Sequence, residues 1–240
     1  MKPGVALIIT AILCGCSPTS ESIGAPAVTR DAAGFPAPDR PVAGIVSPEW
    51  SSGPDRDAAD ESGQLIRALG IKPGMAVADI GAGSGYHTLR LSPAVGPTGL
   101  IYAEDIVEGY IADLRREIER STLTNVRIVI GTADDPRLPP GTMDRAVLVH
   151  MYHEIESPYA LLWNLAGAMK PGGLVGVIDL DRKIENHGTP PVLLKCEFEA
   201  VGYRRKSHAD MAGGTGYIAI FEAPEVRRRP ADIKPCKASR

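Results

Sequence analysis

Apolar positions in the middle of the chain switch repeatedly between short continuous runs and helical spacing. The runs predict strands over 75–80, 100–103, 126–130, 145–150 and 174–180, and 204–208 and 217–221 can form two last strands. Helices are expected over 57–69, directly after the glycines that follow residue 80, around 111–118, from Ser157-Pro158 onward and over 193–201. Strands that alternate with helices imply right-handed crossovers and a mostly parallel sheet. The pattern therefore predicts an α/β fold built on a mostly parallel sheet.

Composition narrows the class of protein. The 240 residues are 44% hydrophobic, which is enough to fill a core. The formal net charge of −3 argues against a dominant nucleic-acid surface, so no nucleic-acid partner is expected. Only one apolar run is long, and it lies at the N-terminus, which excludes a polytopic membrane protein.

The N-terminus has the features of a signal peptide. Val5–Leu13 is apolar apart from Thr10, and a helix of this length would span about 13 Å, less than half of a ~30 Å hydrocarbon core. The segment Leu13-Cys14-Gly15-Cys16-Ser17 resembles a bacterial lipobox, with Cys16 as the lipidated first residue of the mature chain. The alternatives are an ordinary signal peptide and an uncleaved anchor. We expect an extracytoplasmic, membrane-attached lipoprotein on the periplasmic side.

Domain boundaries follow from composition. Residues 1–16 form the signal peptide, and residues 17–55, rich in Pro, Gly, Ala and Ser, are predicted to be a flexible tether. The folded domain is expected over 56–224. Residues 225–240 form a basic tail, expected to be solvated or, as an alternative, to contact anionic lipid headgroups. In an oxidising compartment Cys196 and Cys236 can pair; otherwise Cys196 is buried and Cys236 is free.

A glycine-rich loop carries the strongest chemical signal. The segment Asp79-Ile80-Gly81-Ala82-Gly83-Ser84-Gly85 lies where a strand passes into a helix, and glycine lets a ligand approach the backbone there. A plain tight turn is the structural alternative. Asp105 follows Gly85 by 20 residues and has Glu104 beside it. A carboxylate at that strand end can accept hydrogen bonds from both hydroxyls of a ribose.

The spacing of this loop separates two classes of ligand. A dinucleotide fold needs its third glycine where this chain has Tyr86. The spacing instead resembles that of class I S-adenosylmethionine-dependent methyltransferases, and the resemblance extends over about 57–223. It includes Gly70-Ile71-Lys72-Pro73-Gly74 before the first strand and Lys170-Pro171-Gly172-Gly173 before the fifth.

The resemblance implies a Rossmann-like, doubly wound, mostly parallel seven-stranded sheet with helices on both faces. It also implies S-adenosylmethionine as the cofactor and gives a role to each matched residue. Gly81, Gly83 and Gly85 would line its methionine and ribose, with Ala82 and His150 beside them. Asp79 would face the amino group, and Asp105 or its neighbour Glu104 would hold the ribose. Asp134 would lie near the adenine amino group; Thr132 replaces the acid often found there, so Asp135 is an alternative.

Acceptor chemistry is expected just past the fourth strand, in His150-Met151-Tyr152-His153-Glu154. His153 is the first candidate for a general base, with Glu154 or Tyr152 orienting it or the substrate. His187, in the loop after the fifth strand, is the second candidate. Structural roles for these histidines are the alternative. His150, His153, Asp179 and Asp181 show no specific ligand spacing, so no metal site is expected.

These features favour a lipid-anchored methyltransferase that acts on an unidentified small-molecule or envelope acceptor. The alternatives are a non-catalytic lipoprotein that binds a nucleoside-like ligand, and a nicotinamide-dependent oxidoreductase. S-adenosylmethionine is made in the cytosol, whereas the leader points outward. Either the cofactor reaches the outer compartment, or translation starts further downstream and the mature protein is cytoplasmic.

Overall fold

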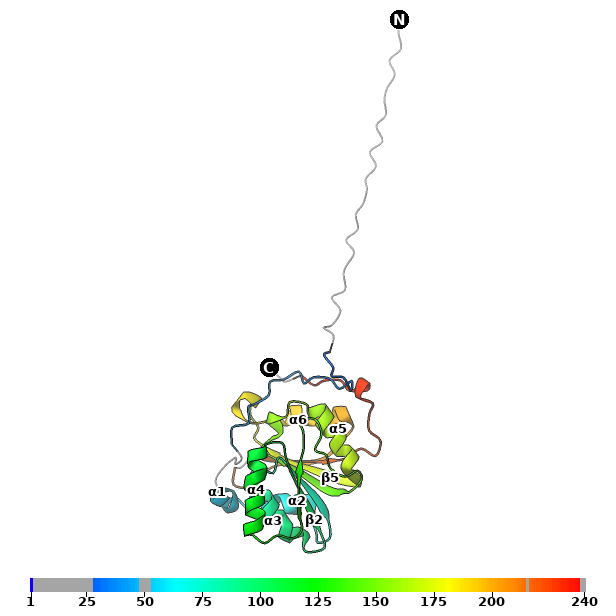
Figure 1. The fold of residues 1–240 in the computed structure, drawn as a ribbon. Helices are drawn as coiled ribbons and strands as arrows, with labels where there is room; N and C mark the ends of the chain where they lie inside the picture. Colours follow the sequence, from blue (N-terminus) through cyan, green and yellow to red (C-terminus); the bar gives the residue numbers. More distant parts are fainter. Residues whose placement is uncertain (2–27, 48–52, 215, 238–240) are drawn as a thin grey trace.

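The computed structural model describes Met1 and residues 28–47, 53–214 and 216–237. At its centre is a seven-stranded sheet in the order β3-β2-β1-β4-β5-β7-β6 (Figure 1). The strands are β1 (Ala76–Ile80), β2 (Leu100–Asp105), β3 (Val126–Ile130), β4 (Met143–Val149), β5 (Met169–Asp179), β6 (Arg204–Asp210) and β7 (Tyr217–Glu222). The pairs from β3 to β5 are parallel, and β7 is antiparallel to both β5 and β6. The predicted Rossmann-like, doubly wound sheet is confirmed.

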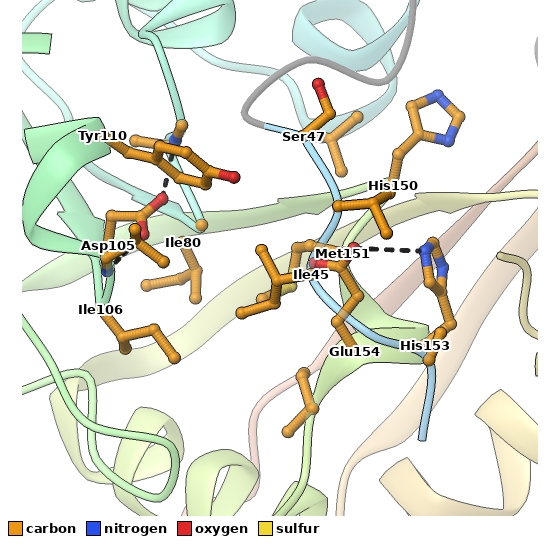
Figure 2. A pocket seen from close by; sticks show the side chains of 18 of the residues that line it. Ile45, Ser47, Ile80, Asp105, Ile106, Tyr110, His150, Met151, His153 and Glu154 are labelled. Carbon is orange, nitrogen blue, oxygen red and sulfur yellow. Dashed lines mark hydrogen bonds and ion pairs between the residues drawn. The ribbon is translucent and has the colours of Figure 1, made fainter. Parts of the chain in front are cut away.

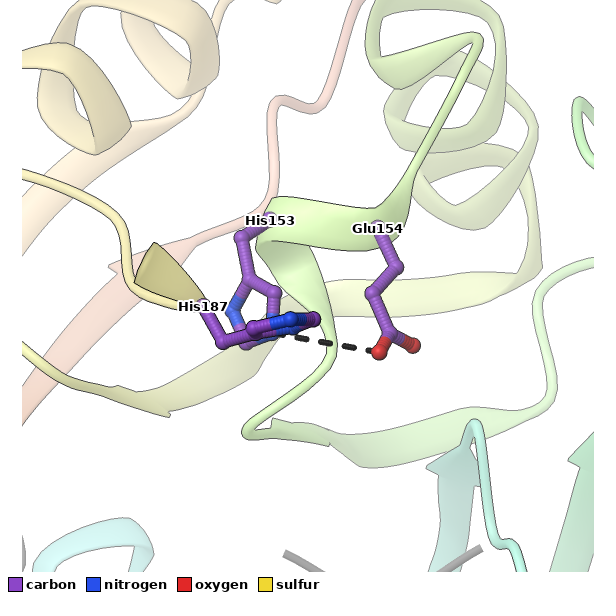
Figure 3. Close-up of side chains that lie close together, drawn as sticks. All are labelled: His153, Glu154 and His187. Carbon is purple, nitrogen blue, oxygen red and sulfur yellow. Dashed lines mark ion pairs between the residues drawn. The ribbon is translucent and has the colours of Figure 1, made fainter. Parts of the chain in front are cut away.

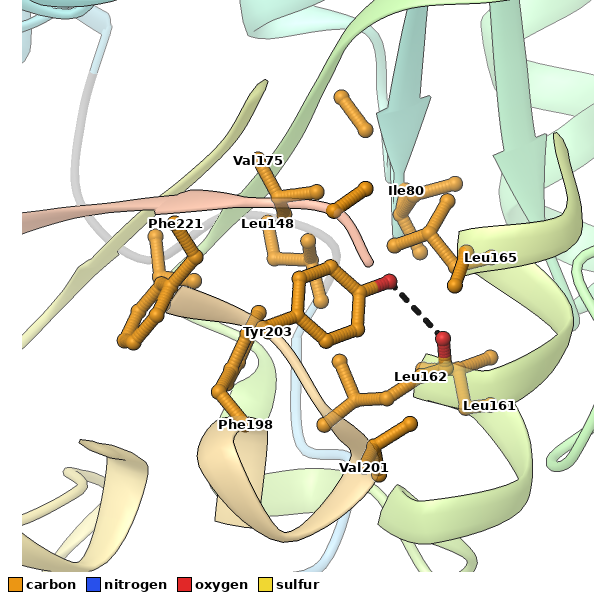
Figure 4. Packing of buried hydrophobic residues seen from close by; sticks show 14 of the residues in the cluster. Ile80, Leu148, Leu161, Leu162, Leu165, Val175, Phe198, Val201, Tyr203 and Phe221 are labelled. Atoms are coloured by element: carbon orange, nitrogen blue, oxygen red, sulfur yellow. Dashed lines mark hydrogen bonds between the residues drawn. The ribbon is translucent and has the colours of Figure 1, made fainter. Parts of the chain in front are cut away.

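Helices cover both faces of this sheet. They are α1 (Gly53–Ala58), α2 (Glu61–Leu69), α3 (Tyr86–Val95), α4 (Glu108–Arg120), α5 (Pro158–Ala168) and α6 (Pro191–Val201), with the short 3-10 turns η1 (Tyr152–Glu154), η2 (Ile184–Asn186) and η3 (Pro230–Asp232). Apolar side chains of α2 and α3 pack on one face, where α4 extends the layer, and those of α5 and α6 pack on the other. Figure 4 shows the apolar cluster on the face covered by α5 and α6, where the buried Tyr203 hydroxyl donates to the Leu162 carbonyl at 2.8 Å.

Two local predictions were wrong in detail. The helix expected over 57–69 is two helices: α1 ends at Ala58, and Asp60, which directly precedes α2, adopts a left-handed backbone with φ of 51° that breaks the helical path. The turn expected at 170–173 lies inside β5: Met143 pairs with Met169, and Arg145 already pairs with Leu174, so the intervening residues bulge out.

Residues 28–47 differ from the expected flexible tether, and we call them the N-terminal strap. Phe35 is buried and its ring lies 5.7 Å from that of Trp163. The guanidinium of Arg40 donates to Glu197 at 2.9 Å, and both side chains are fully buried. The strap is therefore part of the folded body from residue 28 onward, because its few apolar residues and one buried ion pair dock it on the sheet's helical layer.

The basic tail is also packed over residues 225–237. Ile233 is fully buried, and the Trp163 indole donates to the Arg228 carbonyl at 2.7 Å. A disulfide joins Cys196 on α6 to Cys236, so the pairing that the sequence left open is present. The strap, α6 and the tail are thereby linked, which gives the expected solvated tail a structural role.

The signal peptide and Cys16 lie outside the described residues, so the lipobox stays a prediction. Among the residues that are described, none of the helices combines the length and apolar character needed to cross a membrane.

Candidate functional site

The glycine loop lies where predicted, between β1 and α3. Gly81, Gly83 and Gly85 have φ values of 67°, 56° and 95°, a region that L side chains rarely adopt. A Cβ on Gly81 would lie 3.0 Å from Met151 Cγ, and one on Gly85 would lie 2.7 Å from Leu114 Cδ1. The loop therefore needs glycine both for its backbone and for its close packing.

The loop opens on a pocket of about 680 Å³ at the carboxyl ends of β1, β2 and β4. Strand order reverses between β1 and β4, which is where open α/β sheets bind ligands. Figure 2 shows Asp105 and Tyr110 at one end of the pocket and His153 with Glu154 at the other. Ile45 of the N-terminal strap lies between these ends, so the strap forms part of the pocket wall.

Two acidic residues end β2 beside the loop. Asp105 accepts hydrogen bonds from the Gly83 N–H at 2.8 Å and the Val107 N–H at 2.9 Å, and so holds the loop's backbone. Glu104 is 2% exposed. Its Oε2 accepts weakly from the Gly81 N–H at 3.4 Å, whereas its Oε1 has no hydrogen-bond partner among the described residues. Burial, together with the nearby Asp105 charge, raises the pKa of Glu104 to about 8.

Of the two aspartates expected to contact the cofactor, Asp79 lines the pocket and Asp134 does not. Asp79 lines the pocket, where the Thr88 hydroxyl donates to it at 2.7 Å and burial raises its pKa to about 6. Asp134 is exposed; the Thr132 hydroxyl donates to it at 2.7 Å. Neither Asp134 nor Asp135 is among the residues that line the pocket, whereas Thr132 and Ala133 are. The acid that was expected near the adenine amino group, Asp134 or Asp135, therefore does not line the pocket.

His150 belongs to a buried ionic cluster that the sequence did not reveal. Its Nε2 lies 3.0 Å from Glu61 Oε2, and Glu61 also accepts from Arg56 Nε at 2.7 Å and lies 3.2 Å from His87 Nε2. Glu61 is fully buried. Burial alone would raise its pKa, but hydrogen bonds from His150 and His87 hold it well below the usual range.

Arg56 and His87 from this cluster line the pocket together with His150. A sequence signal for the cluster exists, since Glu61 shares the face of α2 that carries the buried Leu65 and Leu69. An acid on an apolar helix face needs a buried partner.

His153 is held by Asp179 at the end of β5. Its Nδ1 lies 3.1 Å from both carboxylate oxygens of Asp179, and both side chains are buried. Asp179 also accepts from the Thr189 hydroxyl at 2.6 Å and from the Leu180 N–H at 2.8 Å. These contacts fix the orientation of the imidazole and leave its Nε2 on the pocket side, 3.9 Å from Glu154 Oε1.

The remaining catalytic candidates separate into two groups. Glu154 and His187 line the pocket beside His153, and burial raises the pKa of Glu154 to about 7. The rings of His153 and His187 have centroids 5.5 Å apart. Tyr152 points away into the core, where it is fully buried and donates to Glu197 at 2.9 Å. Tyr152 therefore does not line the pocket: successive side chains of a 3-10 turn lie about 120° apart, so His153 and Glu154 can face the pocket while Tyr152 faces the core.

Comparisons with known proteins agree with this arrangement. Residues 77–173 match the family model described as a methyltransferase domain. A protein-L-isoaspartate O-methyltransferase from Methanothrix thermoacetophila is 28% identical over 105 residues, which are 44% of this chain and 47% of that protein. A tRNA (adenine(58)-N(1))-methyltransferase from Thermus thermophilus is 28% identical over 153 residues, which are 60% of this chain and 56% of that protein. The chain thus spans about half the length of these curated relatives.

Solved structures share the fold. A SAM dependent methyltransferase from Aquifex aeolicus superposes with a TM-score of 0.65 at 23% identity, covering 71% of this chain and 92% of that chain. The family match includes the glycine loop, both β2 acids, His153 and Glu154, but it begins after Arg56 and ends before His187.

Proposed function

We propose that this chain, which carries a methyltransferase domain on a class I fold, transfers a methyl group from S-adenosylmethionine to a small acceptor held in the same pocket. The observation that carries the proposal is the glycine-loop end of the pocket, where backbone and carboxylates suit a nucleoside. The acceptor end, with His153, Glu154 and His187, is separate from it.

The residues present fit the cofactor. Glu104 has one buried oxygen without a partner among the described residues, and a ribose hydroxyl would supply the missing donor. The glycines leave the backbone open to a ligand, and Arg56 brings a buried positive charge suited to the methionine carboxylate. Asp79, buried in the same wall, suits the cofactor's amino group.

When bound, S-adenosylmethionine would supply a methyl group on a sulfonium: an acceptor would attack the methyl carbon in line, and the sulfur would leave as a neutral thioether. The chain's task is then to align the acceptor and, where the acceptor carries a proton, to remove it. His153 is placed for this role, because Asp179 fixes its Nδ1 and leaves Nε2 available in the pocket. Glu154 beside it can orient the imidazole or the acceptor.

Calorimetric titration separates the proposal from its alternatives. The full chain should bind S-adenosylmethionine and S-adenosylhomocysteine with one site each and should not bind NAD. NAD binding with no response to the other two would replace the proposal with an oxidoreductase. Cofactor binding with no S-adenosylhomocysteine release across a broad panel of hydroxyl, amine and thiol acceptors would favour a non-catalytic nucleoside-binding protein.

Asp105→Ala should weaken S-adenosylmethionine binding by about 1–3 kcal/mol, because it removes a charged acceptor from the ribose. It should also lower the melting temperature, since the Gly83 and Val107 N–H groups lose their partner. Calorimetry and thermal unfolding measure the two effects separately.

Glu104→Gln is the matched variant, since it keeps the size of the side chain and replaces one carboxyl oxygen with an amide nitrogen that cannot accept a hydrogen bond. It should weaken cofactor binding by a similar amount without lowering the melting temperature, because Asp105 still accepts from the Gly83 N–H. Full affinity in Asp105→Ala combined with a loss in Glu104→Gln would assign the ribose to Glu104 alone.

We further propose that the mature protein is a lipoprotein that faces an oxidising compartment. The Cys196–Cys236 disulfide supports this, because such bonds persist outside the reducing cytosol. The proposal requires S-adenosylmethionine to reach that compartment. A downstream translation start with a cytoplasmic product is the competing account.

Cys16→Ser should abolish lipid attachment and leave a precursor whose leader is not removed by the lipoprotein route. The measurement is labelling of cells with a radioactive fatty acid, followed by isolation of the protein. Absence of label on the wild-type chain would contradict the anchor, and a cytosolic wild-type chain would remove the question of cofactor supply.

A further inference from the structure

Three side chains at the acceptor end of the pocket point toward one place. They are His153 and Glu154 on η1 and His187 on the loop after β5 (Figure 3). One ligand-type atom from each lies within 4.8 Å of the other two. Two imidazoles and one carboxylate are a donor set that binds divalent first-row transition ions. The sequence did not reveal this grouping, because it joins residues from two loops and excludes His150, which turns to Glu61.

The surroundings of His153 resemble the outer shell of a metal ligand. Metal-binding histidines usually donate their second ring N–H to a carboxylate, which fixes the ring and makes the other nitrogen a better donor. Asp179 accepts from Nδ1 of His153 and is itself held by the Thr189 hydroxyl and the Leu180 N–H. The carboxylate–imidazole pair is therefore already in place behind the cluster.

The other two ligands can adjust. Ligand atoms around tetrahedral zinc lie about 3.3 Å apart, since each is about 2.0–2.1 Å from the ion. Glu154 and His187 are only partly buried, so rotation of their side chains can close the spacing that the structure shows. His187 also adopts a left-handed backbone with φ of 53°, which is uncommon outside glycine and which aims its ring into the pocket.

We infer that His153, Glu154 and His187 form a binding site for a divalent transition-metal ion at the acceptor end of the pocket. Three protein ligands leave a fourth position for water or for an acceptor oxygen. With the ion bound, His153 is a ligand and no longer accepts the proton. This inference rests on the proposed function only for what the ion would do there.

That role would be to acidify an acceptor hydroxyl. The bound hydroxyl releases its proton to solvent, the new oxygen–methyl bond forms as the methyl–sulfur bond breaks, and the sulfonium becomes a neutral thioether. The inference thus narrows the acceptor class to molecules that bind through an oxygen.

The test titrates ZnCl2 into the full-length chain, first stripped with a chelator and dialysed without reductant so that the disulfide stays intact. The wild-type chain should bind one Zn²⁺ and melt at a higher temperature in its presence. His187→Ala and Glu154→Gln should lose the one-to-one binding and the thermal shift. Asp179→Asn should weaken Zn²⁺ affinity about 10–100-fold through its effect on His153.

The matched control is His208→Ala, which removes an exposed histidine on β6 and should leave Zn²⁺ binding unchanged. No binding by the wild-type chain, or equal binding by wild type, His187→Ala and Glu154→Gln, would overturn the inference. An equal loss in His208→Ala would do the same, because it would place the ion on the surface.

S-adenosylmethionine titration of the same samples without zinc keeps the two proposals apart. Cofactor binding without zinc binding would defeat the metal site and leave His153 as a base. Zinc binding that depends on His187 and Glu154, with no cofactor binding, would support the site and defeat the proposed methyltransferase.

Discussion

Replacing His153 with alanine should lower the turnover number about 10²–10⁴-fold, which is the usual contribution of a positioned acid or base. Cofactor affinity should barely change, because His153 lies at the opposite end of the pocket from Asp105 (Figure 2). The measurement is the initial rate of S-adenosylhomocysteine release with an acceptor found by screening. Calorimetry on the same variant checks that the cofactor end is intact.

A second variant, measured in metal-free protein, tests the assignment to His153. His187→Ala is the matched control, because it removes the neighbouring imidazole and leaves the His153–Asp179 pair intact. If His187→Ala alone reproduces the loss, the base lies on the loop after β5. If both variants keep the wild-type rate, catalysis depends on alignment alone.

Glu61→Gln should cost about 3–5 kcal/mol of unfolding free energy at neutral pH, because it leaves the buried Arg56 without its counter-charge. Urea unfolding measures this directly. Asp60→Asn is the matched control one residue away: Asp60 pairs with Arg67 at the surface, so its replacement should cost about 0–1 kcal/mol. If Glu61→Gln lowers the free energy of unfolding no more than Asp60→Asn does, the buried contacts of Glu61 contribute no net stability.

The same cluster should make the stability of the chain depend on pH in the acidic range. The pKa of Glu61 is lowered in the folded chain from an ordinary value of 4.5, so its contribution to stability is present above that value and is lost as the pH falls below it. Wild-type stability should therefore decline on acidification below about pH 4.5. The decline should be shallower in Glu61→Gln, which has no carboxylate to protonate there.

The sequence predicted most of the sheet well because β1, β2, β4, β5 and β7 each carry a short, largely buried apolar run between recognisable breaks, whereas β6 is exposed throughout. The β1–α3 turn was predictable because its three closely spaced glycines adopt positive φ angles, a local property of the backbone that the sequence shows directly. The break at Asp60 was not, because nothing in the helical apolar pattern of 57–69 marks a left-handed aspartate. An apolar pattern predicts the conformation that its residues usually share, and Asp60 adopts a different one.

The candidate site was predicted less completely because half of it depends on contacts between distant residues. Arg40 meets Glu197 across 157 residues, which is what docks the strap and puts Ile45 in the pocket wall. Tyr152 and His153 are adjacent, and the sequence offered His153 as the base and Tyr152 as a residue that orients it or the substrate, yet Tyr152 faces the core and only His153 faces the pocket. Sequence reasoning found His153 and His187 singly, and only the structure brings them together.

The N-terminal strap has a consequence for how relatives of this chain can be used. The family match begins at residue 77, so the strap and the His187 loop, which complete the acceptor end, fall outside it. The matched segment 77–173 contains the glycine loop and both β2 acids, and at the acceptor end it contains His153 and Glu154 but not His187. Any comparison of this pocket with that of a relative therefore has to include 43–47 and 186–187 as well, because the matched segment supplies only part of the pocket wall.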